Sequence, residues 1–276
     1  MQIPAEMATV TTLCFDVDGT LTDADHQVSP ASLDALRKLD QAGIKLIIVS
    51  GRHPYACAKA LHDAGLHGWT SAANGALNAD IATGEVLRRD PVPADLARQV
   101  IELCHAEQVP CSAFTDDAIL LQQGAEGDDW LLNFLPAANE GMQPIITDLR
   151  DVDPGTMLKL MPGTSAERMA QFFPKVQALT PNTSLSLDEA CEVTGPHSDK
   201  EDGVHYLLEH LGIDPETVAG AGDGGNDVRW LSSIGWPMAM DNARQEVKDV
   251  AKLVLPHHLE DGVAQFVDAF LAMREG

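Results

Sequence analysis

The sequence predicts an α/β protein in which a doubly wound, Rossmann-like parallel sheet carries an inserted α+β unit. Both ends of the chain alternate buried strands with helices, a pattern that is typical of a parallel sheet. The middle instead consists of several strands separated by single helices, which indicates a separate α+β unit. We therefore expect a discontinuous core domain, residues 1–82 and 190–276, and an inserted cap domain, residues 83–189.

The first core segment contains two strand–helix pairs. A short buried strand at residues 9–15 precedes a helix at 29–42, for which Ser29 is a suitable N-cap and Pro30 a suitable first residue. The apolar run IKLIIVS, residues 44–50, predicts a buried strand of the parallel type. A second helix, residues 53–65, follows it and ends at a glycine.

The expected cap begins within a hairpin, residues 75–89, that turns at Thr83 and Gly84. Its further elements are two helices, several short strands and one acidic loop. We place the helices at 93–108 and 165–179, the strands at 111–114, 118–121, 156–161, 183–188 and 191–194, and the loop at 124–129. The core then resumes with a helix at 202–211, a strand at 217–221, a glycine-rich turn and helix, a strand at 237–240, and a final strand and helix.

Composition narrows the possible partners and the compartment. The formal charge of −24 argues against nucleic acid and anionic membrane surfaces, both of which need a basic face. The five cysteines form no C-x-x-C pair, so a disulfide framework is not expected and a reducing, cytoplasmic setting fits. The N-terminus lacks the basic and apolar regions of a signal peptide, and no apolar run approaches a membrane span in length.

The stretch LCFDVDGTLTDAD, residues 13–25, places carboxylates at the end of the first strand. Asp16 and Asp18 alternate along the chain, so both can point into one site beyond the carboxyl end of the sheet. One carboxylate can act as a nucleophile and a neighbour as a general acid and base, and such a pair also attracts Mg²⁺. A calcium-binding EF-hand is excluded by Leu21 and Gln27 at its glycine and glutamate positions. A solvated acidic turn is the alternative for this stretch taken alone.

Three further segments carry polar residues where an α/β sheet binds ligands. Ser50 and Gly51 follow the second strand, where a hydroxyl and a backbone N–H suit a phosphate oxygen. Lys200 opens a helix and could balance the carboxylates, although a lysine alone is more often a solvated surface charge. The turn GAGDGGNDVRW, residues 220–230, holds Asp223, Asn226 and Asp227 after an apolar strand. A calcium β-roll there would need tandem copies, and the sequence has one.

Together and in this order, these motifs resemble those of the haloacid dehalogenase superfamily of phosphoryl-transfer enzymes. DVDGT, residues 16–20, is similar to the first motif of that family, Ser50 to the second, Lys200 to the third and GDGGND, residues 222–227, to the fourth. The Cof-type branch with a type IIB cap is the most similar, because its further marks SGR, ANGA, AMDNA and EDGVAQF also occur. The resemblance covers residues 12–269, and the middle fits the C2B cap of that branch.

The resemblance implies a role for each motif residue. Asp16 would be the nucleophile, and Asp18 would protonate the leaving alcohol and then activate water. An unperturbed Asp16 would be ionised near neutral pH, because such a carboxyl has a pKa of ~4. Mg²⁺ would be held by the carboxylates of Asp16 and Asp223 and by the carbonyl of Asp18. The remaining residues would hold the phosphoryl group or support the site: Ser50, Gly51, Lys200 and Asn226 in the first role, Thr20 and Asp227 in the second.

These roles imply a Mg²⁺-dependent phosphatase that acts on small phosphorylated metabolites, such as sugar phosphates, through an aspartyl-phosphate. One alternative is a phosphomutase similar to phosphomannomutase, whose first motif reads much like FDVDGTLT. The SGR motif and the absence of an arginine-rich cap segment speak against it. A non-catalytic module that binds a phosphorylated ligand is a second alternative, although every residue needed for turnover is present. The motifs do not distinguish a monomer from a homodimer.

The cap would select the substrate, and the sequence leaves its residues open. Four basic residues could read an anionic substrate or serve as surface charges and structural partners: Arg88, Arg89, Lys159 and Arg168. The histidines lack metal-ligand spacing and are expected mostly at the surface: His53, His197, His257 and His258. We expect Trp69 and Trp236 to be packing residues, and Asp23 and Asp25 to lie in a solvated loop or near the cap.

Overall fold

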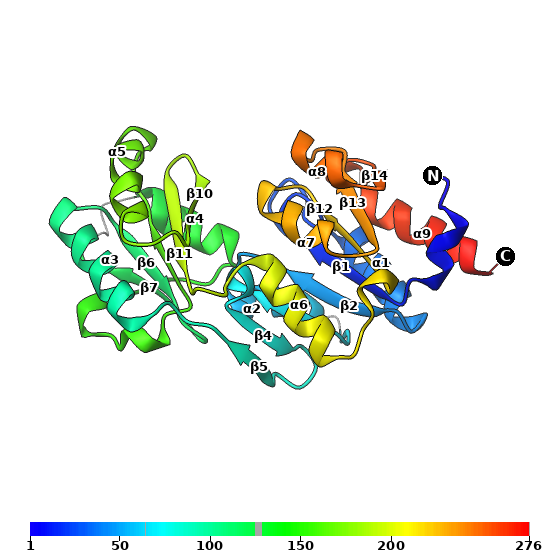
Figure 1. Ribbon diagram of the computed structural model, residues 1–276, viewed down its shortest axis with the longest axis horizontal. Coiled ribbons are helices and arrows are strands. Elements are labelled where there is room, and N and C mark those ends of the chain that lie inside the picture. The colour runs from blue at the N-terminus through cyan, green and yellow to red at the C-terminus, as the bar shows by residue number, and fades with distance from the viewer. Residues whose placement is uncertain (64, 125–128, 276) are drawn as a thin grey trace.

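The chain forms two sheets, each with its own hydrophobic core, that lie next to each other in the computed structural model (Figure 1). The structure describes residues 1–63, 65–124 and 129–275. The larger sheet has eight strands in the order β14-β13-β12-β1-β2-β3-β4-β5, and the smaller has six in the order β10-β11-β9-β6-β7-β8. The α/β core with an inserted cap is therefore confirmed.

The core sheet is parallel from β14 to β3 and antiparallel at β4 and β5. Its central strands β12, β1 and β2 are buried along almost their whole length, which fits the apolar runs in the sequence. The strands are β1 (Thr12–Asp16), β2 (Lys45–Val49), β3 (Trp69–Ala72), β4 (Leu77–Asp80), β5 (Val86–Arg89), β12 (Val218–Gly222), β13 (Trp236–Met240) and β14 (Leu253–Leu255).

Helices cover both faces of the core sheet. The helix between β1 and β2 and the helix between β12 and β13 connect strands in opposite directions across the sheet, so right-handed crossovers place them on opposite faces. The helices are α1 (Pro30–Gln41), α2 (Pro54–Asp63), α6 (Lys200–His210), α7 (Val228–Ser232), α8 (Gln245–Val250) and α9 (Gly262–Glu275). As the sequence predicts, the Ser29 hydroxyl caps α1 by accepting a hydrogen bond from the Ser32 N–H.

The cap consists of the six-stranded sheet and three helices. Its strands are β6 (Cys111–Phe114), β7 (Ile119–Gln122), β8 (Ile145–Thr147), β9 (Lys159–Pro162), β10 (Thr183–Leu187) and β11 (Ala190–Thr194). Its helices are α3 (Ala94–Glu107), α4 (Asp129–Ala138) and α5 (Ala166–Gln177). Among the residues that the structure describes, no helix has both the length and the apolar character that a membrane span requires.

Sheet membership differs from the expected domain boundaries at both ends. The predicted hairpin exists, but both of its strands, β4 and β5, extend the core sheet, so core structure continues past residue 83. Strand β11 pairs with β9 and β10 in the cap sheet, so cap structure continues past residue 189. The strand composition of a hairpin does not show which sheet it joins, and this explains the difference.

Several local predictions also differ from the structure. The strand expected at 9–15 starts later, because residues Ala5–Thr9 form a short 3-10 helix. Strand β3 and helix α4 were not predicted, and α6 begins at Lys200 itself. Residues 125–128 of the expected acidic loop lie outside the described residues. Trp69 and Trp236 pack against the core, as expected.

Candidate active site

Three neighbouring strands of the core sheet end at the same place. Asp16 is the last residue of β1, Ser50 follows β2 directly, and Asp223 follows β12 directly. Because β12, β1 and β2 are adjacent and parallel, their carboxyl ends lie at one edge of the sheet. The fold thus gathers residues as far apart in the sequence as Asp16 and Asp223.

A buried lysine bridges two of the carboxylates. The Lys200 ammonium lies 2.6 Å from Asp16 Oδ1 and 2.7 Å from Asp227 Oδ1, and all three side chains are buried. Burial alone would lower the pKa of Lys200, but attraction to the two carboxylates outweighs it and raises that pKa above its ordinary value. Lys200 is therefore charged throughout the physiological range, which suits it to bind an anionic group beside Asp16.

Asp227 organises the turn after β12. Its Oδ2 atom accepts hydrogen bonds from the Asp223 and Gly224 N–H groups at 3.1 and 2.9 Å. Its Oδ1 atom accepts one from Trp230 Nε1 at 2.9 Å, in addition to the contact with Lys200. Both oxygens are thus engaged by the protein, so Asp227 positions Lys200 and the turn.

Asp223 is held at close range to the turn that carries the first motif. A Cβ atom at Gly19 would lie 2.3 Å from Asp223 Oδ2, and Gly19 has a φ of +73°, so only glycine fits there. The Asn242 amide donates to the Gly19 carbonyl at 2.8 Å and to Asp223 Oδ2 at 3.3 Å. Asn242 therefore links the first and fourth motifs. Thr20, expected to support this turn, is buried and its hydroxyl has no hydrogen-bond partner among the described residues.

The cluster carries more negative than positive charge and fits a divalent cation. Asp16, Asp223 and Asp227 each offer an oxygen, and these atoms lie within 4.8 Å of one another. Burial, reinforced by the neighbouring carboxylates, raises the pKa of Asp223 to about 6 and that of Asp16 well above its ordinary value, despite Lys200. Ionising both groups requires further positive charge, and hard oxygen ligands are those that Mg²⁺ prefers. Asp16 is thus more difficult to ionise here than an unperturbed carboxyl.

The loop after β2 presents a hydroxyl and a backbone N–H. Ser50 is buried, and its Oγ accepts a hydrogen bond from the Arg52 N–H at 3.1 Å, which leaves its own proton available to donate. In the described part of the chain nothing accepts a hydrogen bond from the Gly51 N–H. Both groups are therefore free to bind an anion at this strand end.

Two cap residues hold the same loop from the opposite side. Lys159 on β9 donates to the Gly51 carbonyl at 2.7 Å and forms an ion pair with Glu192 of β11 at 2.6 Å. Glu192 also accepts a hydrogen bond from the Asn74 side chain at 2.7 Å. Of the four basic residues considered for the substrate, Lys159 contacts the loop of Ser50 and Gly51, and its charge is balanced by Glu192.

The other three of these basic residues are arginines, and each has a structural partner. Arg88 donates to the carbonyls of Asp202 and His197, and Arg89 pairs with Asp116. Arg168 donates to the carbonyls of Glu107 and Gln108 at the end of α3. These contacts favour the structural alternative for each of the three.

The histidine and loop predictions are only partly correct. His53 is fully buried, which corrects the prediction of a surface position, because the ring lies at the core–cap junction 5.8 Å from Phe114. Asp25 is exposed, as expected of a solvated loop. Asp23 instead organises that loop, since its Oδ1 accepts from the N–H groups of Asp25 and Gln27.

A cleft of about 600 Å³ lies between the cap and the core. Lys200 and Asn226 line its core side, and Glu192 and the β10 strand line its cap side. Asn226 is exposed at this surface, next to the turn that Asp227 organises. Lys200 is thus the residue that contacts the carboxylate cluster and also lines the cleft, so the cleft lies next to the cluster.

The family model of the haloacid dehalogenase-like hydrolases matches residues 13–267. The chain belongs to this family. Its members include relatives that match nearly full length: the pyridoxal phosphate phosphatase YbhA of Escherichia coli is 26% identical, with 95% of this chain and 99% of the relative covered. An HMP-PP phosphatase of Serratia proteamaculans is 24% identical, with 93% and 94% covered. This chain is thus a haloacid dehalogenase-like hydrolase.

Solved structures of the family share the fold. A haloacid dehalogenase-like hydrolase from Bacteroides thetaiotaomicron has a TM-score of 0.85 at 22% identity, with 94% of this chain and 98% of the other covered. The subclass IIB sugar phosphatase BT4131 has a TM-score of 0.79 at 22% identity, with 95% and 99% covered. At this identity the likeness concerns the arrangement of core and cap.

The sequence motifs do not by themselves identify three polar residues that contact the site. Asn242, Arg52 and Asn74 lie inside the family marks AMDNA, SGR and ANGA, but the sequence alone gives them no partner. Trp230, which donates a hydrogen bond to Asp227, lies three residues after the end of the fourth motif, on helix α7. A polar residue inside such a mark is the signal that could have identified the first three.

Proposed function

We propose that this hydrolase is a Mg²⁺-dependent phosphatase of small phosphorylated metabolites, with sugar phosphates or similar monoesters as its substrates. One observation carries the proposal: a buried ammonium, Lys200, lies between the carboxylates of Asp16 and Asp227, and the same residue is among those that line the cleft. Lys200 can bind a phosphate oxygen while an oxygen of Asp16 faces the phosphorus. This is the arrangement that a phosphoryl transfer to a carboxylate requires.

In the first step, an Asp16 carboxylate oxygen attacks phosphorus. The bond between phosphorus and the leaving oxygen breaks, and Asp18 gives that oxygen its proton, so an aspartyl-phosphate and a free alcohol result. Ser50 Oγ, the Gly51 N–H, Lys200 and Asn226 hold the phosphoryl oxygens meanwhile. Because Ser50 and Lys200 are held by the loop and helix contacts described above, these two donors need no reorganisation as charge develops.

In the second step, Asp18 takes a proton from a water molecule whose oxygen attacks the phosphorus. The bond between phosphorus and Asp16 breaks, which releases inorganic phosphate and restores both carboxyl groups. Asp16 and Asp223, with the Asp18 carbonyl, would hold Mg²⁺, which when bound neutralises charge between the carboxylate and the phosphate.

The size and lining of the cleft support a small substrate. Its 600 Å³ lies within the range of small-molecule sites, and polar side chains of Asn182, Thr183 and Ser184 line the cap side. The strongly negative charge of the chain favours such a metabolite over nucleic acid or a membrane surface as partner. Five buried free thiols support a cytoplasmic setting.

The test is phosphate release from a panel of sugar phosphates, pyridoxal phosphate and p-nitrophenyl phosphate, with Mg²⁺ or with EDTA. We expect release that depends on Mg²⁺, and a loss of about a thousandfold or more in Asp16→Asn, because the amide is a far weaker nucleophile. Asp268→Asn is the matched control, since Asp268 pairs with Lys38 at the surface. Mg²⁺-independent release, or equal rates for Asp16→Asn and wild type, would contradict the proposal.

A further inference from the structure

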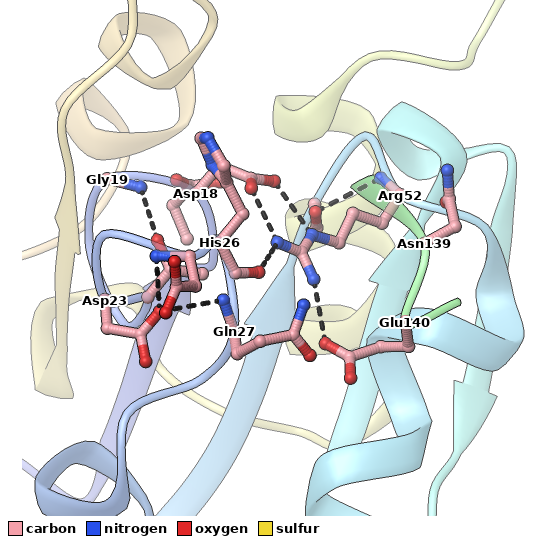
Figure 2. Close-up of polar contacts among 12 residues, drawn as sticks. Asp18, Gly19, Asp23, His26, Gln27, Arg52, Asn139 and Glu140 are labelled. Atoms are coloured by element: carbon pink, nitrogen blue, oxygen red, sulfur yellow. Dashed lines mark hydrogen bonds and ion pairs between the residues drawn. The ribbon is translucent and has the colours of Figure 1, made fainter. Parts of the chain in front are cut away.

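Arg52 joins three separate parts of the chain. Its side chain is buried, and Figure 2 shows the guanidinium between Asp18 on one side and Glu140 on the other. Nε and Nη2 donate to the two carboxylate oxygens of Asp18 at 2.9 and 2.7 Å. Nη1 donates to Glu140 Oε1 at 3.0 Å, and Nη2 also donates to the His26 carbonyl at 2.7 Å. One core side chain thus contacts the first-motif loop and the cap together.

The guanidinium links its partners rigidly. It is planar, with its N–H groups in a fixed fork, so it cannot turn toward one carboxylate without changing its geometry toward the other. The bidentate contact with Asp18 also uses both oxygens of that side chain. A displacement of Glu140 by cap movement is therefore transmitted to the orientation of Asp18.

Asp18 depends on this contact for its position. Its side chain is 47% exposed, and within the described ranges Arg52 is its only side-chain hydrogen-bond partner. An exposed carboxylate without such a partner would sample several rotamers. Arg52 is thus the group that selects one orientation.

The two other partners of Arg52 have an unusual backbone. His26 and Glu140 both have positive φ values, +59° and +54°, which non-glycine residues rarely adopt. Such conformations persist where surrounding contacts hold them, and they cluster at functional sites. A second contact supports the same junction, because Asn139 Oδ1 accepts a hydrogen bond from the His53 N–H at 2.8 Å. The segment 52–53 is therefore seated against the segment 139–140.

We propose that Arg52 is a positioning residue that couples the orientation of the Asp18 carboxylate to the docking of the cap through Glu140. This inference rests on the proposed role of Asp18 as general acid and base. The cap contact at Glu140 holds the guanidinium in place, and the guanidinium holds Asp18 ready for proton transfer. Cap docking then acts on the proton-transfer step in addition to enclosing the substrate.

The kinetic test uses leaving groups that differ in their need for a proton. Glu140→Asn removes the charge and shortens the side chain, while asparagine tolerates a positive φ. For the alkyl phosphate of the panel that wild type hydrolyses fastest, we expect leaving-group release in the first turnover to be about tenfold slower in Glu140→Asn than in wild type. The full effect of general acid catalysis is about 10²- to 10⁴-fold, and the variant loses only part of it because Asp18 itself remains. For p-nitrophenyl phosphate, whose leaving group departs without a proton, the first-turnover rate should change less than about twofold.

Two further variants separate this effect from general damage to the junction. Asp116→Asn is the matched control, because Asp116 also forms an ion pair between cap and core, with Arg89, but does not contact Asp18. It should leave both rates unchanged. Glu140→Gln keeps an acceptor within reach of Arg52 and should recover most of the alkyl rate. Equal losses on both substrates, or an alkyl rate that is unchanged or higher in Glu140→Asn, would overturn the proposal.

A second measurement does not depend on activity. The unfolding equilibrium constants of Asp18→Asn, Glu140→Asn and the double variant form a cycle, which we expect to be non-additive by about threefold or more, since both residues share Arg52. The corresponding cycle of Asp18→Asn with Asp116→Asn should be additive. Additivity in the first cycle overturns the coupling even in an active enzyme. If wild type releases no phosphate, the proposed function fails while the cycle still decides whether the coupling exists.

Discussion

The core side and the cap side of the cleft are built in different ways. On the core side, the site residues lie in short motifs at the ends of adjacent strands, and Lys200 is the one cation among three clustered carboxylates in the described structure. On the cap side, Lys159 and Glu192 form a balanced ion pair. The core cluster thus holds negative charge in excess, whereas Lys159 and Glu192 on the cap side neutralise each other.

This difference separates ligand binding from domain docking. An excess of buried carboxylates is costly unless a cation compensates it, so the core cluster fits a metal ion in addition to Lys200. A balanced pair needs no ligand, so Lys159 and Glu192 can hold the cap on the Gly51 loop whether the cleft is filled or empty. Substitutions on the core side and on the cap side should therefore affect stability and kcat to different extents.

The largest effect is expected for Lys200→Met. Removal of the ammonium leaves Asp16 and Asp227 buried without their cation, which should lower the free energy of unfolding by about 3 to 5 kcal/mol. Loss of a phosphate ligand should also reduce kcat about 10²- to 10³-fold. Urea unfolding in EDTA measures the first effect, and phosphate release with Mg²⁺ the second. Lys38→Met, which removes an exposed ion pair with Asp268, should cost less than about 1 kcal/mol.

A smaller effect is expected for Glu192→Gln on the cap side. Lys159 then stays buried without a carboxylate, and its described partners are the neutral Gly51 carbonyl and the Phe114 ring. This should lower the free energy of unfolding by about 2 to 3 kcal/mol. Because Lys159 reaches the site through a backbone carbonyl, we expect kcat to fall less than in Lys200→Met. Glu107→Gln, in the exposed cap pair with Lys175, is the control and should be nearly neutral. A kcat loss as large as that of Lys200→Met would remove the distinction between the two sides.

The same contrast explains what could be predicted from the sequence. The strands β1, β2 and β12 are buried apolar runs, so their ends and the carboxylates beyond them can be located from local pattern. That Asp16, Ser50 and Asp223 meet follows from the parallel order of these strands. The core cluster therefore needs little information beyond strand positions.

The cap contacts required the structure. Glu140 follows a helix that the sequence pattern did not reveal, and its pairing with Arg52 joins residues 88 positions apart. The hairpin of β4 and β5 looks alike whether it extends the core or the cap, so its sheet could not be assigned. His53 was expected at the surface, because a lone histidine in a helix start gives no indication of burial. Pairing across domains leaves no periodic pattern in either segment.

The last prediction asks whether the core–cap junction at His53 excludes a protonated, charged imidazole ring. Its ring is fully buried beside Phe114, and burial lowers its pKa from 6.5 to about 4. The unfolded chain therefore binds a proton on this histidine at a higher pH than the folded protein does. The contribution of the buried neutral His53 ring to the free energy of unfolding is complete above pH ~6.5. It declines as the pH falls, and no further loss occurs below pH ~4.

Between about pH 7 and pH 5 this loss amounts to about 1 to 2 kcal/mol of the free energy of unfolding. In His53→Gln the overall stability should fall, but its slope over this pH range should become flatter than that of wild type, as measured by urea unfolding at several pH values. His197→Gln replaces an exposed histidine and should retain the wild-type slope. Parallel pH profiles for wild type and His53→Gln would mean that the junction accepts the charged ring, so cap docking there would not depend on an uncharged contact.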